Sequence, residues 1–450
     1  MADRSAPGPD GGHLIGALSK FKSNSLGLIS DLQRRFGGIA RVKLGPYLVH
    51  QVTDPELIKH VLQDNPGNYR RGRFYRGFNL FMGHGMLTTD GAEWKARRQV
   101  AQPFFQRARL ESAAPIITEC VDDLLDSWAE PARDGEVIDI VDDVMRLSMG
   151  VLSRTLFGVD LRDRADELLP VVRFAIKAMI ITGKVEQMLP RWVPTRYQRD
   201  LKKHQAVLNG VLDDVIARQR ARGTDDDNLV AALLSAEHPE TGRPWDDRAI
   251  RAELKTHFMA GHETTGCALA WTLYAVAQHA DVRRKLTAEL DEVLAGRTPT
   301  VEDLPKLTYL RQVVDESLRV YPPIWVYPRD AVEDDEIGGY HVPAGTTVLI
   351  SPHAAHHNAD VWESPEAFDP ERFCPANRHT TRYRYLPFGG GQRHCIGHHL
   401  ALLELQLAVA MITQRYRLDL ASGHQVVPTG LVSLRPKSGV QMRIERIDQE

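Results

Sequence analysis

The chain has 450 residues, of which 43% are hydrophobic, and its formal net charge is −3 at neutral pH. This length is ample for a large buried core, and no linker, internal repeat or low-complexity tract divides the sequence into several domains. The near-neutral charge gives no reason to expect nucleic acid or an anionic membrane surface as a partner.

The cysteines and the N-terminal residues indicate where the protein works. Four cysteines stand at wide, unpatterned spacings, which argues against a disulfide framework and fits a reducing cytoplasm. Residues 1–12 are polar and rich in proline, glycine and aspartate, and they lack the basic start and apolar run of a signal peptide or membrane anchor. We expect residues 1–13 to be disordered and residues 14–450 to form a single domain.

The first hundred residues mix helix and strand signals. Residues 25–36 predict a helix, and residues 40–44 and 47–52 predict two strands that Gly45-Pro46 joins as a hairpin. Residues 70–89 predict a loop, because glycines are interspersed there with aromatic residues. Those aromatic residues are Phe74, Tyr75, Phe78 and Phe81.

A basic helix follows this loop. Trp94 and Arg98 are four residues apart, so they share one face of the helix. The stretch 94–109 contains no acidic residue, and a run of this kind is commonly a solvated face. Its other cations are Lys95, Arg97, Arg107 and Arg109. From residue 110 to residue 230 the pattern is helical almost throughout.

A long helix is predicted over residues 247–279, and its middle reads Ala260-Gly-His-Glu-Thr-Thr265. Glycine inside a helix costs roughly 1 kcal/mol, so its presence suggests a functional gain. Gly261 can let the helix open beside a flat cofactor. Thr264 can bond back to a helix carbonyl or hold a water, and Glu263 offers an acid.

Two charged motifs and a small β region follow in the C-terminal half. Glu316 and Arg319 are three apart on a helix, a pattern that alone indicates a surface ion pair of little energetic value. The second motif is Phe368-Asp-Pro-Glu-Arg-Phe373, which contains Arg372. Between them, residues 338–350 predict a pair of strands. The expected fold class is therefore mainly α with a minor β-rich region.

The stretch from Phe388 to Gly397 reads Phe-Gly-Gly-Gly-Gln-Arg-His-Cys-Ile-Gly. An apolar helical pattern follows at once, so Cys395 should lie at or just before a helix N-terminus, where backbone N–H groups favour a thiolate. The glycines let the backbone pass close to a flat, bulky group. A lone thiolate of this kind is suited to ligate haem iron.

Two other interpretations of this cysteine stay open on the residues alone. A single cysteine in a glycine-rich turn is more often a small buried hydrophobic residue than a ligand. Zinc is conceivable because three histidines cluster around the cysteine, although a structural zinc site usually has two paired half-sites. These histidines are His394, His398 and His399.

The ten-residue stretch resembles the cysteine-ligand loop of the cytochrome P450 family, the haem-thiolate monooxygenases. In the family pattern an aromatic residue is followed three places on by Gly, and then by Arg, Cys and Gly at alternate places. Phe388, Gly391, Arg393, Cys395 and Gly397 fill these five positions. The other three motifs resemble family motifs in the same order, so the resemblance covers roughly residues 14–445, and the expected fold is that of the family.

The resemblance implies one haem b, with Cys395 as the axial ligand of its iron. The implied cofactor-binding residues are Trp94, Arg98, Arg329, Arg393, Phe388, Gly389, Ala260 and Gly261, of which the arginines and Trp94 would hold the propionates. It also implies that Glu263 and Thr264 deliver protons for dioxygen chemistry. Glu316, Arg319 and Arg372 would form a buried structural network. The implied substrate pocket contains Phe78, Phe81, Ile324, Trp325, Val326 and Val432.

The implied reaction inserts one oxygen atom from dioxygen into a C–H or C=C bond of a hydrophobic small molecule. Electrons would come from NAD(P)H through a reductase and a ferredoxin or flavodoxin, which would dock on the basic stretch 94–109. We expect a soluble, bacterial-type hydroxylase of secondary metabolism that oxidises a terpenoid or polyketide-type compound. A fatty-acid hydroxylase is the alternative. A peroxygenase and a haem-thiolate ligand sensor without turnover are less consistent with the Glu263-Thr264 pair.

Overall fold

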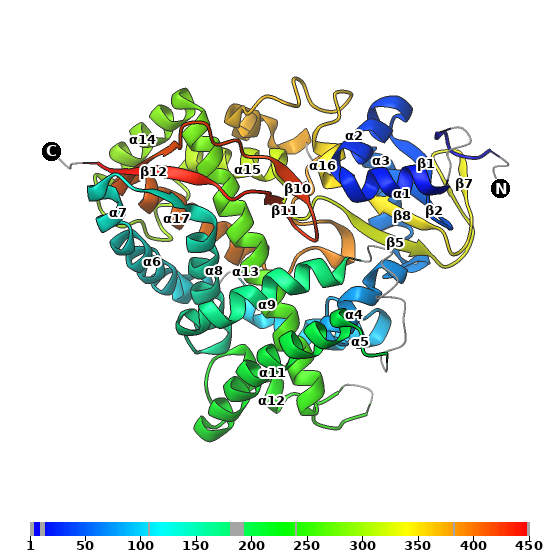
Figure 1. The fold of residues 1–450 in the computed structure, drawn as a ribbon, viewed down its shortest axis with the longest axis horizontal. Coiled ribbons are helices and arrows are strands. Elements are labelled where there is room, and N and C mark those ends of the chain that lie inside the picture. Colours follow the sequence, from blue (N-terminus) through cyan, green and yellow to red (C-terminus); the bar gives the residue numbers. More distant parts are fainter. Residues whose placement is uncertain are drawn as a thin grey trace.

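Two regions of unequal size make up the structure, a large helical region and a smaller one built on a β-sheet (Figure 1). This computed structural model describes residues 4–9, 14–106, 109–180, 193–238, 241–380 and 383–447. The predominance of helix with a minor β region confirms the predicted fold class. None of the helices in these ranges is long and apolar enough to cross a membrane.

The described part of the chain contains these α-helices, in chain order: α1 (Leu14–Ser23), α2 (Ser25–Phe36), α3 (Pro55–Lys59) with a π-helical turn (His60–Asp64), α4 (Arg76–Met82), α5 (Gly91–Ala101), α6 (Leu110–Ser127), α7 (Ala129–Asp134), α8 (Ile140–Phe157), α9 (Ala165–Met179), α11 (Arg196–Arg222), α12 (Leu229–Ser235), α13 (Asp247–Gln278), α14 (Ala280–Leu294), α15 (Thr308–Val320), α16 (Pro352–His356) and α17 (His398–Arg415). The predicted helices over residues 25–36 and 247–279 therefore form as α2 and α13.

The principal sheet has five strands in the order β1-β2-β8-β5-β3. These strands are β1 (Ile39–Leu44), β2 (Tyr47–Val52), β3 (Tyr69–Arg70), β5 (Tyr327–Ala331) and β8 (Thr347–Ile350). The β1–β2 hairpin forms as predicted, whereas β2 and β8 pair in parallel. Along β8, Val348 and Ile350 belong to one apolar cluster and Leu349 to another, so the sheet is covered on both faces.

Three smaller sheets complete the β structure of the residues described above. One joins β4 (Val137–Asp139), β12 (Gln441–Arg446) and β9 (Tyr416–Leu420), another joins β6 (Asp335–Ile337) to β7 (Tyr340–Val342), and the third is the hairpin of β10 (Pro428–Gly430) and β11 (Leu434–Pro436). The hairpin turns through residues 431–433, which lie beside the middle of α13 and near the sheet.

Helix α13 runs through the middle of the molecule (Figure 1). The side chain of Asp246 caps it by accepting a hydrogen bond from the Ala249 N–H. Helix α17 packs against it, and residues on every side of α17 are buried, including Leu407, Val409 and Ile412. A helix that is apolar all round belongs in a core, so these two helices form the rigid frame of the helical region.

Two expectations about irregular segments are wrong. Residues 4–9, within the segment expected to be disordered, lie along β1, where the Arg41 N–H donates to the carbonyl of Pro7 at 2.7 Å and Ala6 is 1% exposed. The predicted loop 70–89 contains the helix α4, which ends where Gly83 adopts a positive φ of 84°. Residues 181–192 lie outside the described residues.

Candidate active site

A cavity of about 1180 Å³ lies between α13, the cysteine loop and the edge of the principal sheet. Its presence shows in the exposure pattern of α13: Ala260 is exposed and Gly261 and Thr264 are half-buried, although the helix around them is buried. Cys395 is also exposed, and it faces the same cavity. The sequence prediction that these residues meet around one space is therefore consistent with the structure.

The cysteine loop is held in shape by glycine geometry. Gly391 has a positive φ of 62°, and a Cβ atom there would lie 2.0 Å from the carbonyl oxygen of Leu62. The Cys395 N–H donates to the Phe388 carbonyl at 2.9 Å, which closes the loop. Since α17 begins at His398, Cys395 lies just before a helix N-terminus, as predicted.

The surroundings of the Cys395 thiol shift its pKa in opposite directions. Although Cys395 is exposed to the cavity, the cavity lies within the protein, and this burial raises the pKa of the thiol, whereas the Gly397 N–H and the guanidinium of Arg98 lower it. The helix start and the cation therefore favour the thiolate as expected, but they do not outweigh burial. The zinc interpretation finds no support, because among the described residues no three histidine, cysteine or acidic side chains group as metal ligands.

One edge of the cavity carries a surplus of positive charge. Arg98, Arg329 and Arg393 line it together with Trp94, over whose ring the Arg393 guanidinium lies at 4.1 Å. Arg393 forms an ion pair with Asp90. Its pKa falls to about 9 because it is buried, with Arg71 the next cause. Such an edge suits an anionic group, and it unites the four residues predicted to bind propionates.

Arg71 is a member of this edge that sequence reasoning missed. It lines the cavity, and its Nε and Nη1 atoms are buried without a hydrogen-bond partner among the described residues. Buried N–H groups of a cation need an acceptor, so Arg71 points to an anion that the cavity would hold. The signal was present in the sequence as Arg70-Arg71-Gly72-Arg73, a cationic run without an acid.

Glu263 and Thr264 are neighbours on α13 with different partners. The Thr264 hydroxyl donates to its own helix at the Ala260 carbonyl (2.6 Å), which is the back-bonding predicted for it. The Glu263 carboxylate instead contacts β11 and the turn before it: Ser433 Oγ donates to Oε1 at 2.6 Å, and Arg435 Nε lies 3.3 Å away. Sequence reasoning did not find Arg435.

Gly261 has a packing reason that the sequence did not show. A Cβ atom at this position would lie 2.0 Å from Leu152 Cδ1 on α8, so a larger residue would require the Leu152 side chain to move. Helix α13 continues unbroken from Asp247 to Gln278, and the predicted opening at this glycine does not occur.

The predicted pocket residues line the cavity with one exception. Phe78, Ile324, Trp325, Val326 and Val432 all line it. Phe81 does not: it is 1% exposed and packs in the main core. The reason is that residues 76–82 are helical, so Phe78 and Met82 share the cavity face while Phe81 is turned toward the core.

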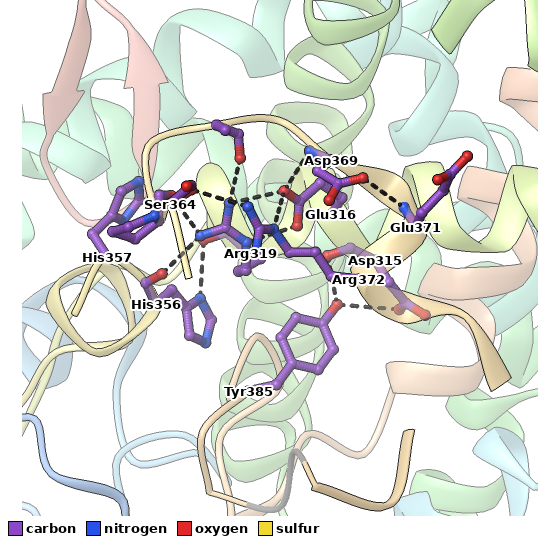
Figure 2. A network of polar contacts seen from close by, with 12 residues as sticks. Asp315, Glu316, Arg319, His356, His357, Ser364, Asp369, Glu371, Arg372 and Tyr385 are labelled. Atoms are coloured by element: carbon purple, nitrogen blue, oxygen red, sulfur yellow. Dashed lines mark hydrogen bonds and ion pairs between the residues drawn. The ribbon is translucent and has the colours of Figure 1, made fainter. Parts of the chain in front are cut away.

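Behind the cysteine loop, two arginines and a glutamate form a buried network (Figure 2). Glu316 and Arg319 are both 0% exposed and make two hydrogen bonds of 2.7 and 2.8 Å. Arg319 also donates to the carbonyls of residues 356, 365 and 367. Arg372 Nε donates to Glu316 at 3.2 Å. The structure thus brings together the three residues predicted for this network.

His356 extends this network toward the cavity, and no motif in the sequence indicates this role. Its Nδ1 lies 3.0 Å from the Arg319 carbonyl oxygen, and its Nε2 accepts from the Leu386 N–H at 2.8 Å. Burial holds the pKa of His356 well below its usual range, which keeps the ring neutral. Leu386 lines the cavity just before the cysteine loop, so the buried charges fix the start of that loop.

Comparison with known proteins identifies the family of this chain. A family model described as Cytochrome P450 matches residues 6–442. The chain belongs to the cytochrome P450 family. The heme domain of a cytochrome P450DA crystal structure superposes with a TM-score of 0.89 at 25% sequence identity, covering 99% of this chain and 98% of that one.

Its relatives among curated P450 proteins include two of Streptomyces melanosporofaciens. A cyclooctat-9-en-7-ol 5-monooxygenase is 37% identical over 389 residues, which is 85% of this chain and 83% of the relative. A cyclooctatin synthase is 33% identical over 88% of this chain and 86% of the relative. The pentalenene oxygenase of Streptomyces avermitilis is 26% identical over 96% and 95% of the two chains. This P450 is a monooxygenase that uses dioxygen and a hydrophobic substrate.

P450 proteins bind haem b through a cysteine thiolate, and the residues of this cavity fit that group. The cavity presents a cysteine from a glycine-shaped loop, and one edge carries arginines of which Arg71 lacks an acceptor. When bound, haem b supplies the activation of dioxygen. The protein supplies orientation, charge and shelter from water.

The basic helix does not present the whole cationic face expected of it. Arg97 is buried in ion pairs with Glu253 (2.8 Å) and Glu93 (2.7 Å), so it cannot face a partner. Arg109 pairs with Asp227. Arg107 lies outside the described residues. Lys95 keeps an exposed position on this helix.

Glu404 on α17 predicts a pH dependence of stability. It is 4% exposed, and burial raises its pKa to about 7 from 4.5, although the Ser148 hydroxyl opposes the rise. The folded state therefore binds more protons than the unfolded state between these values, and stability falls as pH rises through that window. At about 1.4 kcal/mol per pKa unit, the loss reaches roughly 3 kcal/mol.

The Glu404→Gln variant should lack this loss. Urea denaturation at successive pH values will measure the free energy of unfolding of both haem-loaded proteins, and the two curves should diverge above about pH 5. Parallel curves would show that Glu404 keeps an ordinary affinity for protons.

Proposed function

We propose that this P450 oxidises a cyclic terpenoid in secondary metabolism, inserting one oxygen atom into a C–H or C=C bond. The observation that carries the proposal is the lining of the cavity, which is predominantly apolar. Its apolar side chains include Phe74, Phe78, Met82, Leu152, Met179, Ile324, Val326, Leu431 and Val432. A compact hydrocarbon is held there by burial of apolar surface, and two relatives are named for terpenoid skeletons.

The roles of the site residues belong to the same proposal. Cys395 Sγ would hold the haem iron, and the arginines at positions 71, 98, 329 and 393 would bind the propionates with Trp94. Phe388, Gly389, Ala260 and Gly261 bound the space for the cofactor. Arginine suits carboxylate binding because its planar donors make paired, charge-assisted bonds. Thr264 lines the cavity, and Glu263 and Thr264 relay protons to it.

Electrons come from NAD(P)H through a reductase and a ferredoxin or flavodoxin in the cytoplasm. Lys95 supports a docking site near the cysteine loop, because it is exposed on the helix whose Arg98 donates to the His394 carbonyl. Because Arg97 and Arg109 are engaged in ion pairs, the basic stretch offers fewer cations for docking than its sequence indicated. Four free cysteines agree with a reducing compartment.

A fatty-acid hydroxylase is the second candidate, and one observation favours it. Lys22 and Lys437 are exposed and line the same cavity, where either ammonium group could pair with a substrate carboxylate. A terpene hydrocarbon has no use for such a cation, so the two candidates predict different ligand preferences.

A Soret titration of the ferric protein tests the proposal. Cyclooctat-9-en-7-ol and pentalenene serve as cyclic probes and palmitate as the fatty acid, and a low-to-high spin shift reports that a ligand displaces water from the iron. We expect the cyclic probes to shift the spectrum at lower concentration than palmitate. A shift by palmitate alone, lost in a Lys22→Gln, Lys437→Gln double variant, would replace the terpenoid proposal by fatty-acid hydroxylation.

A further inference from the structure

The carboxylate of Glu263 is held by side chains from a distant part of the chain. Oε1 accepts from Ser433 Oγ and pairs with Arg435 Nε, and the thiol of Cys267 one helical turn away lies 3.6 Å from it. Glu263 is 3% exposed, and the Arg435 side chain is 16% exposed. Because water competes little there, the pair fixes the carboxylate more firmly than a surface ion pair would.

This arrangement separates Glu263 from Thr264. Successive residues of an α-helix point about 100° apart, so the two side chains leave α13 in different directions. Both residues line the cavity, but the Thr264 hydroxyl bonds to the Ala260 carbonyl, whereas the Glu263 carboxylate is held by Ser433 and Arg435. No hydrogen bond joins the two side chains, so a proton passes between them when the carboxylate turns toward Thr264 or a water bridges them.

The same hairpin also contacts the space for the substrate. Leu431 and Val432 at its turn line the cavity, next in the chain to Ser433. The turn is anchored by two indole N–H groups: Trp325 donates to the Leu431 carbonyl at 2.8 Å, and Trp271 donates to the Leu434 carbonyl at 2.9 Å. A ligand that contacts Val432 therefore contacts a short turn whose ends are fixed by these two hydrogen bonds, and a displacement of the turn would reach Ser433 directly.

We propose that Ser433 and Arg435 are positioning residues for proton supply: they hold the Glu263 carboxylate away from Thr264, and ligand contact at Leu431 and Val432 releases it. The inference rests on the proposed monooxygenase function and deepens it. It makes proton supply depend on an occupied pocket, so that an empty site is not supplied with protons. The pKa of Arg435 agrees with the ion pair, because Glu263 raises it although burial opposes the rise.

Difference infrared spectroscopy of the haem-loaded protein tests the release directly. Spectra with and without cyclooctat-9-en-7-ol or pentalenene, whichever shifts the Soret band, should show a change in a carboxylate band that Glu263→Gln removes. Arg435→Gln and the smaller change Ser433→Ala should also remove or shift this ligand-dependent change. Arg283→Gln is the matched control, because Arg283 pairs with Asp419 at 2.9 Å outside the cavity. An unchanged signal in both hairpin variants would overturn the proposal.

Coupling of electrons to product provides the second readout. The amount of product formed per NADPH should fall roughly tenfold in Arg435→Gln. This effect is smaller than that of removing a proton-transfer group itself, because Arg435 acts only through Glu263. The Arg283→Gln control should match the wild type. Arg435→Lys should restore part of the loss, because it keeps the positive charge. If Glu263→Gln uncouples turnover and both hairpin variants do not, the positioning role is wrong and the proposed function stands. If the wild type yields no product from any probe, the proposed function fails. The infrared result then still tests whether ligand binding changes the environment of the Glu263 carboxylate through Ser433 and Arg435.

Discussion

Replacement of Cys395 by serine will abolish the red-shifted Soret band of the reduced carbonyl complex. A thiolate pushes electron density to haem iron in a way that a hydroxyl oxygen does not, and the band reports that bond. The measurement is a difference spectrum of the dithionite-reduced protein with and without carbon monoxide. Monooxygenase activity should be lost with the band.

Cys374→Ser is the matched control, because Cys374 is half-buried and does not line the cavity. It should keep both the band and the activity. Survival of the band in Cys395→Ser would show that another residue ligates the iron, and its loss in Cys374→Ser would show that the assay responds to general damage.

Replacement of Arg319 by alanine will destabilise the fold by about 3–5 kcal/mol and leave little haem-loaded protein. The reason is that Glu316 would remain fully buried with less positive charge around it, and three backbone carbonyls would lose their donor. The start of the cysteine loop would lose its support through His356. Urea denaturation and the ratio of haem to protein after purification measure the two effects.

Lys285→Ala provides the comparison for this variant. Lys285 pairs with Glu371, the neighbour of Arg372, but both side chains are about half exposed. An exposed ion pair contributes little to stability, so this variant should load haem normally. Equal holoprotein yields from Arg319→Ala and the wild type would show that the buried network does not hold the fold.

Much of the site could be predicted because it resides in short motifs. The cysteine loop, Glu316 with Arg319, and the middle of α13 each place several informative residues within ten positions, and local geometry then fixes how they lie. The hairpin of β1 and β2 was also readable, since its turn and its apolar runs are local. In each case the interactions that determine the local structure join residues close together in the sequence.

The residues that were missed act through long-range contacts. Arg435 is 172 positions from Glu263, so no spacing rule connects the two. His356 likewise meets the Arg319 carbonyl only in the folded chain. Phe81 was misplaced because residues 70–89 were treated as a loop. In the helix that forms there, side chains four residues apart share a face, and Phe81 lies on the face that packs in the core.

Arg97 and Arg98 show an error that periodicity could have avoided. Arg98 lies four residues after Trp94, and both line the cavity. Arg97 lies four after Glu93, and these two form an ion pair on another face of the helix. Neighbours in a helix point about 100° apart, so the two arginines could not both serve one surface. The composition of the basic stretch concealed this difference.

The most direct measurement of the central claim is turnover with isotopically labelled dioxygen. The haem-loaded protein, NADPH, a surrogate ferredoxin with its reductase and the cyclic terpenoid that shifts the Soret band are incubated together, and the product is analysed by mass spectrometry. The account predicts a product that carries one labelled oxygen atom. Consumption of NADPH with the terpenoid recovered unchanged, or a product whose oxygen comes from water, would contradict it.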